Sequence, residues 1–264
     1  MTVVRPPAVA GTFYPADPGA LARMIDGMLA DVEVHGDRVA PVALIVPHAG
    51  YVYSGPIAAS AYARLAPWRE SITRVVVIGP AHRVPVRGLA LSSADSFATP
   101  LGLVPVDQAS NAAVEGLPGV HVDDRAHAPE HSIEVQLPFL QATLTGGWML
   151  VPIIAGIAPA ATVAEVLDVF WGEPGTLVVV SSDLSHYHVA QAARRLDAAT
   201  AASIVAARWE LLDSDDACGV VPVRGALELS RRHGQQVALL DLRNSADTAG
   251  PPDRVVGYGS FLVR

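Results

Sequence analysis

Short hydrophobic runs, several of them rich in β-branched residues, alternate along this chain with segments of helical character. Strands that are covered on both faces read as continuous hydrophobic runs, so these runs predict buried strands. The predicted strands cover residues 42–46, 74–78, 148–154, 177–180, 237–242 and 255–263. The predicted helices cover residues 18–32, 56–65, 133–143, 160–171, 189–208 and 221–232. This alternation is typical of an α/β fold with a mostly parallel central sheet covered by helices.

No segment divides the chain into separate domains. The sequence has no Ser/Gly-rich linker, no charge run and no repeat at a fixed period. We therefore expect one domain over residues 1–264. The segments 99–105 and 247–253 read as surface connections, because Pro is frequent in both.

The charged residues exclude several classes of enzyme and of binding partner. Of the 264 residues, 51% are hydrophobic and 17% are charged, as in globular proteins. All 18 basic residues are Arg, and the absence of Lys excludes Schiff-base chemistry, pyridoxal phosphate enzymes and P-loop nucleotide sites. The net charge is −8 and the Arg residues are scattered, so we expect no nucleic-acid partner.

The number of cysteines and the apolar stretches indicate in which cellular compartment we expect the protein. A single Cys excludes a disulfide framework and any Cys-only zinc or iron–sulfur site, and we expect a cytoplasmic location. The N-terminal residues lack the basic and apolar regions of a signal peptide. The longest uncharged stretch, 135–164, is interrupted by Pro and Gly, so we expect no membrane span.

Three predicted strands end in polar segments that carry His, and two of these segments are PHAGYVYSG with His48 and GPAH with His82. Ligands of open parallel sheets bind where the carboxyl ends of the strands meet. If the two strands are neighbours, the imidazoles meet, and paired imidazoles indicate a metal site. The alternative is that each His caps a helix or hydrogen-bonds its own loop. Tyr51 and Tyr53 would either face the pocket or pack in the core.

The third strand end, SSDLSHY, adds Asp183 and His186 to the same edge of the sheet. Asp183 could orient an imidazole, and His186 could move protons near neutral pH. The alternative is that Asp183 or Ser185 caps a helix that begins near His188.

Cys218 precedes a predicted helix. The N-terminal dipole of that helix would favour a thiolate, and hence a metal ligand or a nucleophile. The alternative is a small core residue, since free Cys is often buried. The preceding Asp213, Asp215 and Asp216 read as a solvated turn.

The segment APEHSIEVQLPFLQ places Glu130, His131 and Glu134 at a helix start, with His131 and Glu134 three apart on one face. The segment is not an HExxH motif, which excludes a zincin-type metalloprotease. The alternative is a capping arrangement in which Glu130 interacts with the helix N-terminus. We predict that Glu130 and His131 line the pocket together with Tyr51.

Seven segments, in this order along the chain, resemble the Memo family: VRPPAVAGTFYP, PHAGYVYSG, GPAH, EHSIEVQLPFL, SSDLSHY, ACGVVPV and VGYGSFLV. The resemblance runs from Arg5 almost to the last residue. Bacterial and archaeal members are also called AmmeMemoRadiSam system protein B. The family is similar in fold to the class III extradiol ring-cleavage dioxygenases, which use non-haem Fe(II). The resemblance therefore implies one α/β domain with a metal pocket at one end of its sheet.

Carried over residue by residue, the resemblance implies that His48 and His82 are metal ligands. It also implies that Cys218 stands where the dioxygenases have a Glu ligand. His186 matches the position of their acid/base His, and Asp183 lies close by. A thiolate is a softer ligand than a carboxylate, which shifts the preference towards Cu(I), Zn or a differently tuned Fe(II). We expect Fe(II), with Cu or Zn as alternatives.

Three functions remain open at this point. The first is a metal-dependent oxidoreductase acting on a small cyclic or phenolic substrate, in which His186 takes and returns a proton. The second, which the resemblance implies, is a non-catalytic module that binds a peptide, a ligand or a metal and works with AMMECR-type and radical SAM proteins. The third is a hydrolase with Ser182 or Cys218 as nucleophile, but no GxSxG motif supports it.

Overall fold

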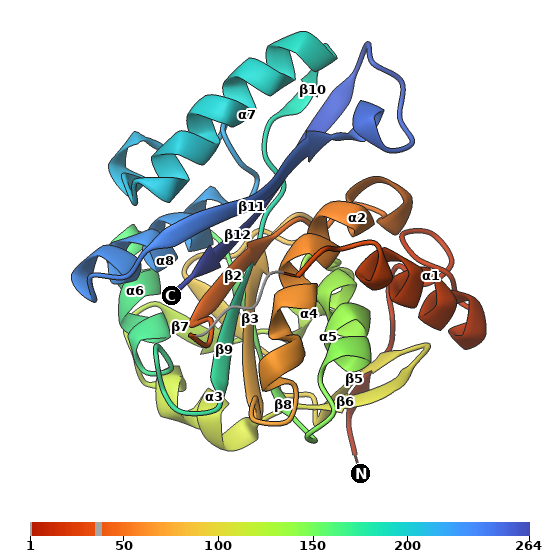
Figure 1. The fold of residues 1–264 in the computed structure, drawn as a ribbon. Helices are drawn as coiled ribbons and strands as arrows, with labels where there is room; N and C mark the ends of the chain where they lie inside the picture. The colour runs from red at the N-terminus through yellow and green to blue at the C-terminus, as the bar shows by residue number, and fades with distance from the viewer. Residues whose placement is uncertain (1, 35–38) are drawn as a thin grey trace.

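A nine-stranded mixed sheet runs through the molecule (Figure 1). The computed structural model describes residues 2–34 and 39–264. The strand order is β10-β12-β2-β9-β3-β8-β4-β7, and β11 pairs with β12 outside this path. The four central strands are parallel to one another. They are β2 (Ala43–Val46), β9 (Thr176–Ser181), β3 (Arg74–Pro80) and β8 (Met149–Ala155).

Antiparallel pairs flank this parallel centre on both sides. On one side β12 (Val255–Val263) pairs antiparallel with β2, with β11 (Val237–Asn244) and with β10 (His186–His188). On the other side β4 (Leu89–Leu91) pairs antiparallel with β8 and parallel with β7 (Val120–Val122). The predicted α/β fold is confirmed, and the arrangement is consistent with the class III extradiol dioxygenase-like fold that the resemblance implies.

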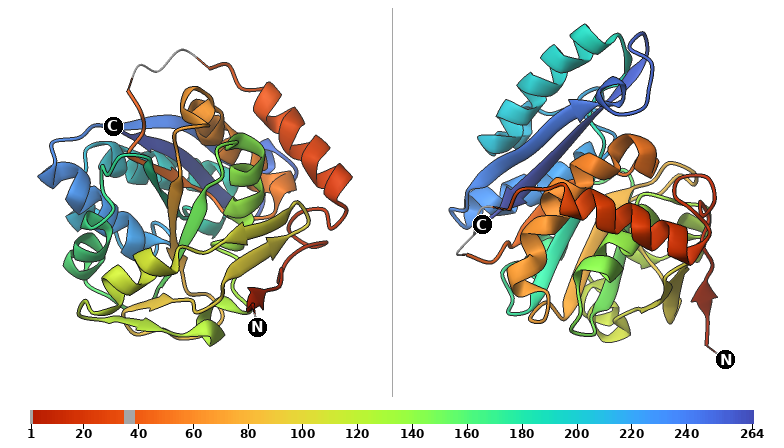
Figure 2. Two further views of the ribbon diagram at one scale, coloured as in Figure 1. Left: turned by 90° about the horizontal axis from the view of Figure 1, so that it is seen from below. Right: turned by 45° about the vertical axis from the view of Figure 1, so that its right-hand side comes forward.

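The central strands are hydrophobic throughout because both of their faces are buried. In β3, Val75 and Val77 face one hydrophobic core, and Val76 and Ile78 face the other. Helices cover each face, as the two views of Figure 2 show. Leu21 and Ile25 of α1 lie in the first core. The first face carries α1 (Pro18–Ala30), α2 (Tyr51–Tyr62) and α5 (Leu137–Thr143), and the second carries α6 (Ala160–Asp168) and α8 (Val220–Arg232).

A small second sheet and several short elements complete the fold. The small sheet has the order β1-β5-β6. The surface connection predicted at 99–105 is wrong, because β5 and β6 form an antiparallel hairpin there, with Gly102 in the left-handed region beside the turn. α7 packs against β11 and β12 (Figure 1). The remaining bounds are β1 (Val4–Arg5), β5 (Ser96–Thr99), β6 (Gly102–Pro105), α3 (Gln108–Glu115), α4 (Asp124–His127), α7 (Ala190–Val205) and the 3-10 helices Ala63–Trp68, Glu134–Gln136, Trp209–Leu211 and Ser245–Asp247.

Two element boundaries differ from the prediction in ways that matter for the site. α2 begins at Tyr51 rather than at residue 56, so the loop that carries His48 is short. His188 ends strand β10 instead of starting a helix, and α7 begins at Ala190. Both differences place the His residues on short, constrained segments rather than on long loops.

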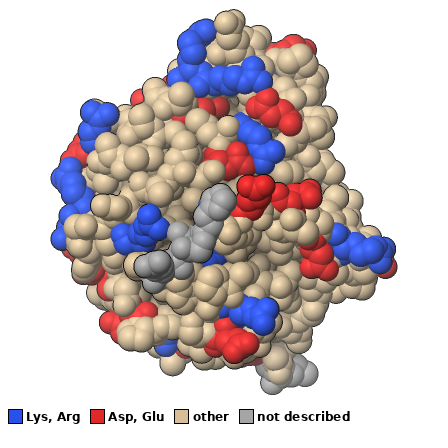
Figure 3. All heavy atoms as spheres, in the orientation of Figure 1, with Lys and Arg blue, Asp and Glu red and all other residues tan. Residues whose placement is uncertain are grey.

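Charges of both signs are mixed over the surface in view. On the face shown in Figure 3, Arg side chains and acidic side chains lie interspersed, without a broad patch of one sign. Among the described residues, none of the helices combines the length and the hydrophobicity that a membrane-spanning segment needs.

A buried carboxylate ties the N-terminal segment to the core. The Glu134 side chain is fully buried. Its oxygens accept hydrogen bonds from the Arg5 guanidinium, the Tyr14 hydroxyl and the backbone amides of Ala8 and Val9. A buried charge is costly unless it is paired and hydrogen-bonded, and here both carboxylate oxygens have donors. Glu134 thus anchors the chain N-terminus rather than serving the predicted pocket.

We expect Glu134→Ala to lower the free energy of unfolding by about 3–5 kcal/mol, because it leaves the Arg5 guanidinium buried without its carboxylate. Urea denaturation of the two proteins measures the difference. Glu165→Ala, at an exposed position of α6, is the matched control and should change stability by less than about 0.5 kcal/mol. Equal losses in the two variants would contradict the anchoring role.

Candidate metal centre

The ends of β2, β9 and β3 bring the candidate residues together. His48 follows β2, Asp183 follows β9 and His82 follows β3. The two His-bearing strands are not neighbours, because β9 lies between them. The imidazoles nevertheless meet across the end of β9, with their ring centroids 5.1 Å apart.

Cys218 approaches the two imidazoles from the start of α8. Gly219 is the N-cap of α8, and a Cβ added there would lie 2.6 Å from the Ser181 carbonyl oxygen, so only Gly allows this close approach. The Cys218 Sγ lies 3.3 Å from His48 Nε2. One ligand atom from each of His48, His82 and Cys218 lies within 4.8 Å of the others. The three predicted ligands therefore lie in one place, and their role as ligands stays a prediction.

Asp183 holds both His48 and Cys218. Its Oδ1 accepts a hydrogen bond from the His48 backbone N–H at 2.7 Å, and its own N–H donates to the Cys218 Sγ at 3.3 Å. Among the described residues no hydrogen bond joins Asp183 to the His186 ring. The capping alternative for Asp183 is wrong, since Val189 is the N-cap of α7 and makes no side-chain cap.

Two members of the cluster, His48 and Cys218, are held in neutral forms. Burial, followed by the neighbouring His82 and His131, lowers the pKa of His48 well below its ordinary value. Burial, followed by the charge of Asp183, raises the pKa of the Cys218 thiol. The thiolate that the helix dipole led us to expect is therefore not the favoured state in the absence of a cation, whereas a coordinated metal ion would remove the thiol proton.

A carboxylate with many donors lies behind His82. Glu130 accepts hydrogen bonds from the backbone N–H groups of His82, His131 and Ser132, and its Oε1 lies 2.9 Å from His82 Nδ1. Burial alone would raise the pKa of Glu130, but hydrogen bonds from His131 and His82 outweigh it and hold the pKa below its ordinary value. His82, Glu130 and His131 form a second group with ligand atoms within 4.8 Å. Because N–H donors already occupy the Glu130 oxygens, the group with Cys218 is the stronger metal candidate.

The other two predicted pocket residues lie at different depths. His131 is 9% exposed and stacks on His82 with a centroid distance of 4.7 Å. Tyr51 is 1% exposed, donates its hydroxyl hydrogen to the Val135 carbonyl oxygen and packs on Phe139. Tyr51 therefore packs in the core, which is the alternative that the sequence left open, and it does not line the pocket.

A pocket of about 760 Å³ opens beside His82 and Cys218. The Asp-rich turn at 213–216, which the sequence predicted as a solvated turn, forms one wall of this pocket. No local pattern signals that wall, because tertiary contacts such as the hydrogen bond from the Thr200 hydroxyl of α7 to Asp216 hold the turn in place. The remaining lining residues are His186, Tyr187, His188 and Leu196.

A family model described as "Memo-like protein" matches residues 5–262 of this chain. The chain belongs to the Memo family. A MEMO1 family protein of Aquifex aeolicus is 35% identical over 271 residues, which cover 97% of this chain and 97% of the relative. A MEMO1 family protein of Methanosarcina barkeri is 35% identical over 282 residues, covering 98% and 100%. One from Ignicoccus hospitalis is 36% identical over 279 residues, covering 98% of both chains. The resemblance seen in the sequence is confirmed.

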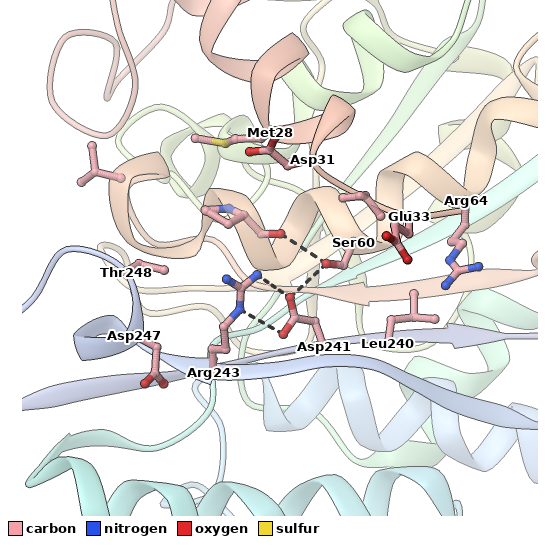
Figure 4. Close-up of a pocket in the computed structure, with 13 residues that line it drawn as sticks. Met28, Asp31, Glu33, Ser60, Arg64, Leu240, Asp241, Arg243, Asp247 and Thr248 are labelled. Atoms are coloured by element: carbon pink, nitrogen blue, oxygen red, sulfur yellow. Dashed lines mark hydrogen bonds and ion pairs between the residues drawn. The ribbon is translucent and has the colours of Figure 1, made fainter. Parts of the chain in front are cut away.

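A second pocket of this Memo-family chain, about 620 Å³, lies between α1, α2 and β11 (Figure 4). Two of its charged groups pair with each other, since Arg243 donates to Asp241, and Asp241 also accepts from the Ser60 hydroxyl. Neither of the two three-ligand groups found among the described residues lies in this pocket. We therefore place the candidate site at the cluster of His48, His82 and Cys218.

A strained residue lies in β10 at the rim of the Memo-family pocket. Tyr187 has a φ of 64°, and the pairing of β10 with β12 shifts register between His186 and His188. The Tyr187 side chain is largely exposed, and the Arg254 guanidinium lies 4.3 Å from the centroid of its ring. Such bulges re-aim side chains beside functional sites, and here both His residues line the pocket.

We expect Tyr187→Gly to be more stable than Tyr187→Ala by about 1 kcal/mol, because both variants lose the ring but only Gly adopts a positive φ without strain. Urea denaturation of both variants measures the difference. The same pair of substitutions at Arg195, an exposed position inside helix α7, is the control, and there the Ala variant should be the more stable by about 1 kcal/mol. An Ala variant as stable as the Gly variant at Tyr187 would contradict the strained backbone.

Proposed function

We propose that this Memo-family protein binds a metal ion through His48, His82 and Cys218 and acts as an oxidoreductase on a small cyclic or phenolic substrate. The observation that carries the proposal is the convergence of these three ligand atoms within 4.8 Å at the side of an open pocket. The pocket also contains His186, a side chain that can transfer protons near neutral pH.

The donor set fits a redox-active transition metal. Imidazole suits Fe, Cu and Zn, and a thiolate adds a soft ligand that hard cations such as Mg²⁺ do not select. Three protein ligands leave room in the coordination sphere for a substrate, as catalytic centres require. His82 and Cys218 both line the pocket, so a molecule that enters the pocket reaches the ligands directly.

We propose Fe(II) as the native metal, with Cu or Zn as alternatives, because the family resembles Fe(II) dioxygenases in fold. When bound, Fe(II) would supply the redox chemistry that O₂ activation needs. The chain itself would supply orientation and proton transfer. A ring nitrogen of His186 would take the proton of a phenolic hydroxyl and return it later. Asp183, through its contacts with His48 and Cys218, would keep the ligands in place.

The pocket also sets the size of the substrate. Its volume of about 760 Å³ lies within the range of small-molecule sites and holds a single-ring phenol with substituents. Tyr187 and Leu196 provide apolar surface on the lining, and the Asp-rich turn provides a polar wall. This mixture suits a ring that carries hydroxyl groups.

We expect about one equivalent of iron in the anaerobically purified wild-type protein, measured by elemental analysis. His48→Ala and Cys218→Ser should each lose most of it, because each removes one of three protein ligands. His186→Ala should keep its iron and lose O₂ uptake with a catechol probe. The control is His233→Ala, an exposed His paired with Asp168 far from the cluster, which should keep both.

The metal content of these proteins distinguishes a metal centre from a binding module without metal. Full metal content in His48→Ala and Cys218→Ser would refute the ligand assignment. A wild-type protein that binds no metal even after anaerobic reconstitution would overturn the metal proposal. That result would favour the alternative of a binding module that works with AMMECR-type and radical SAM proteins.

Glu130→Gln tests which three-ligand group holds the metal. If Glu130 only orients His82, the amide oxygen can still accept from Nδ1, and the metal content should fall less than in Cys218→Ser. Elemental analysis of the two variants side by side measures this. Complete loss in Glu130→Gln with full retention in Cys218→Ser would assign the metal to His82, Glu130 and His131 instead.

A further inference from the structure

The hydrogen bonds behind His48 have only one consistent direction. Gln136 Nε2 lies 2.9 Å from the Pro47 carbonyl oxygen and 2.8 Å from Ser181 Oγ. A carbonyl oxygen can only accept, so the amide nitrogen of Gln136, and not its oxygen, must face Pro47. The other end of the amide is consistent with this, because Gln136 Oε1 accepts from the Tyr62 hydroxyl at 2.8 Å. Gln136 is therefore a donor to Ser181.

Ser181 has only one way left to contact His48. Its Oγ lies 2.6 Å from the Ser132 carbonyl oxygen, so its single hydrogen is donated there. The same oxygen already accepts from Gln136. At 2.9 Å from His48 Nδ1 it can only accept again, which requires a hydrogen on Nδ1. The Nε2 of a neutral His48, 3.3 Å from Cys218 Sγ, then keeps its lone pair.

His82 also carries its hydrogen on Nδ1, but a different residue accepts it. Its Nδ1 lies 2.9 Å from Glu130 Oε1, and the Glu130 carboxylate also accepts the backbone N–H groups of His82, His131 and Ser132. An ionised carboxylate can only accept, so the hydrogen lies on His82 Nδ1. Nε2 is the nitrogen that His82 can offer to a ligand.

We propose that Gln136, Ser181 and Glu130 are positioning residues that hold both imidazoles as the Nδ1–H tautomer in the metal-free protein. The inference rests on the metal centre proposed above and names the residues that prepare it. Neutral imidazole in water favours the Nε2–H tautomer, which would place a hydrogen where the lone pair is needed. A partner that holds the hydrogen on Nδ1 leaves Nε2 free for the metal. No tautomer change is then needed when the metal binds, so binding costs less free energy.

At His48, burial strengthens this selection. Ser181 and Gln136 are 0% exposed and His48 is 1% exposed, so water cannot replace a missing partner. Reversing the His48 tautomer would leave a bare Nδ1 facing an oxygen whose only hydrogen is donated to Ser132. An unsatisfied buried pair of this kind disfavours the other tautomer about 5- to 150-fold at equilibrium.

The test is ¹⁵N NMR of histidine-labelled, metal-free protein at slightly alkaline pH, together with Zn²⁺ affinity from competition with a chromophoric chelator. The wild type should show the Nδ1–H tautomer at His48 and at His82. Ser181→Ala removes the acceptor of His48 Nδ1–H, so an Nε2–H population should appear at His48 only. The Zn²⁺ affinity should fall about 10–100-fold. Ser230→Ala, a fully buried Ser of α8 outside the network, is the matched control and should change neither readout.

Ser181→Cys keeps the test decisive if Ser181→Ala does not fold, because the thiol keeps the bulk of the side chain but is a weak acceptor for the His48 Nδ1–H, so it should also mix the His48 tautomers. An Nε2–H tautomer in the wild type, or an unchanged Nδ1–H tautomer in both variants, would overturn the inference. Loss of Zn²⁺ affinity without any tautomer change would also overturn it, since the role would then be merely structural. Wild-type protein with both Nδ1–H tautomers but no metal binding would instead support the tautomer assignment and overturn the proposed metal centre.

Discussion

The parallel pairing of β2, β9 and β3 decides where the candidate metal ligands of this chain lie. Val46 at the end of β2 is paired with Ser181 at the end of β9, and β3 runs parallel on the other side of β9. Parallel strands in register end at the same edge, so the segments that follow them emerge together. The imidazoles of His48 and His82 meet across β9 for this reason, although their strands never touch each other.

The segment between residues 130 and 136 holds this edge of the sheet together from behind. Its four polar side chains other than His131 are fully or almost fully buried, and each has a different partner. Glu130 contacts His82, Glu134 holds the N-terminal segment, and Gln136 reaches Ser181. The hydroxyl of Ser132 donates to the last carbonyl of β3. A buried polar network of this kind stabilises one arrangement only when every member has its partner, and this requirement makes the site rigid before a ligand binds.

The pocket side of the centre is built differently. It is formed by short and irregular segments, namely β10 with the strained Tyr187, the Asp-rich turn at 213–216 and the start of α7. Strained backbone persists only where the surrounding structure determines it, and here the pairing of β10 with β12 does so. The candidate centre therefore combines a hydrogen-bonded side that contains the buried His48 with an exposed rim that contains Tyr187.

The fold class, the central strands and the family can be read from the amino-acid sequence alone, because continuous hydrophobic runs and whole motifs are local signals. The sequence also singled out His48, His82 and Cys218, since each directly follows a strand or precedes a helix. It did not show that β9 lies between the two His-bearing strands, nor that Tyr51 packs in the core and the Asp-rich turn lines the pocket. It did not show which ring nitrogens carry hydrogen, because these depend on the carbonyls of Pro47 and Ser132, which lie far from each other in the chain. Only the tertiary structure decides such contacts, because strand order and hydrogen-bond direction are set by residues distant in sequence.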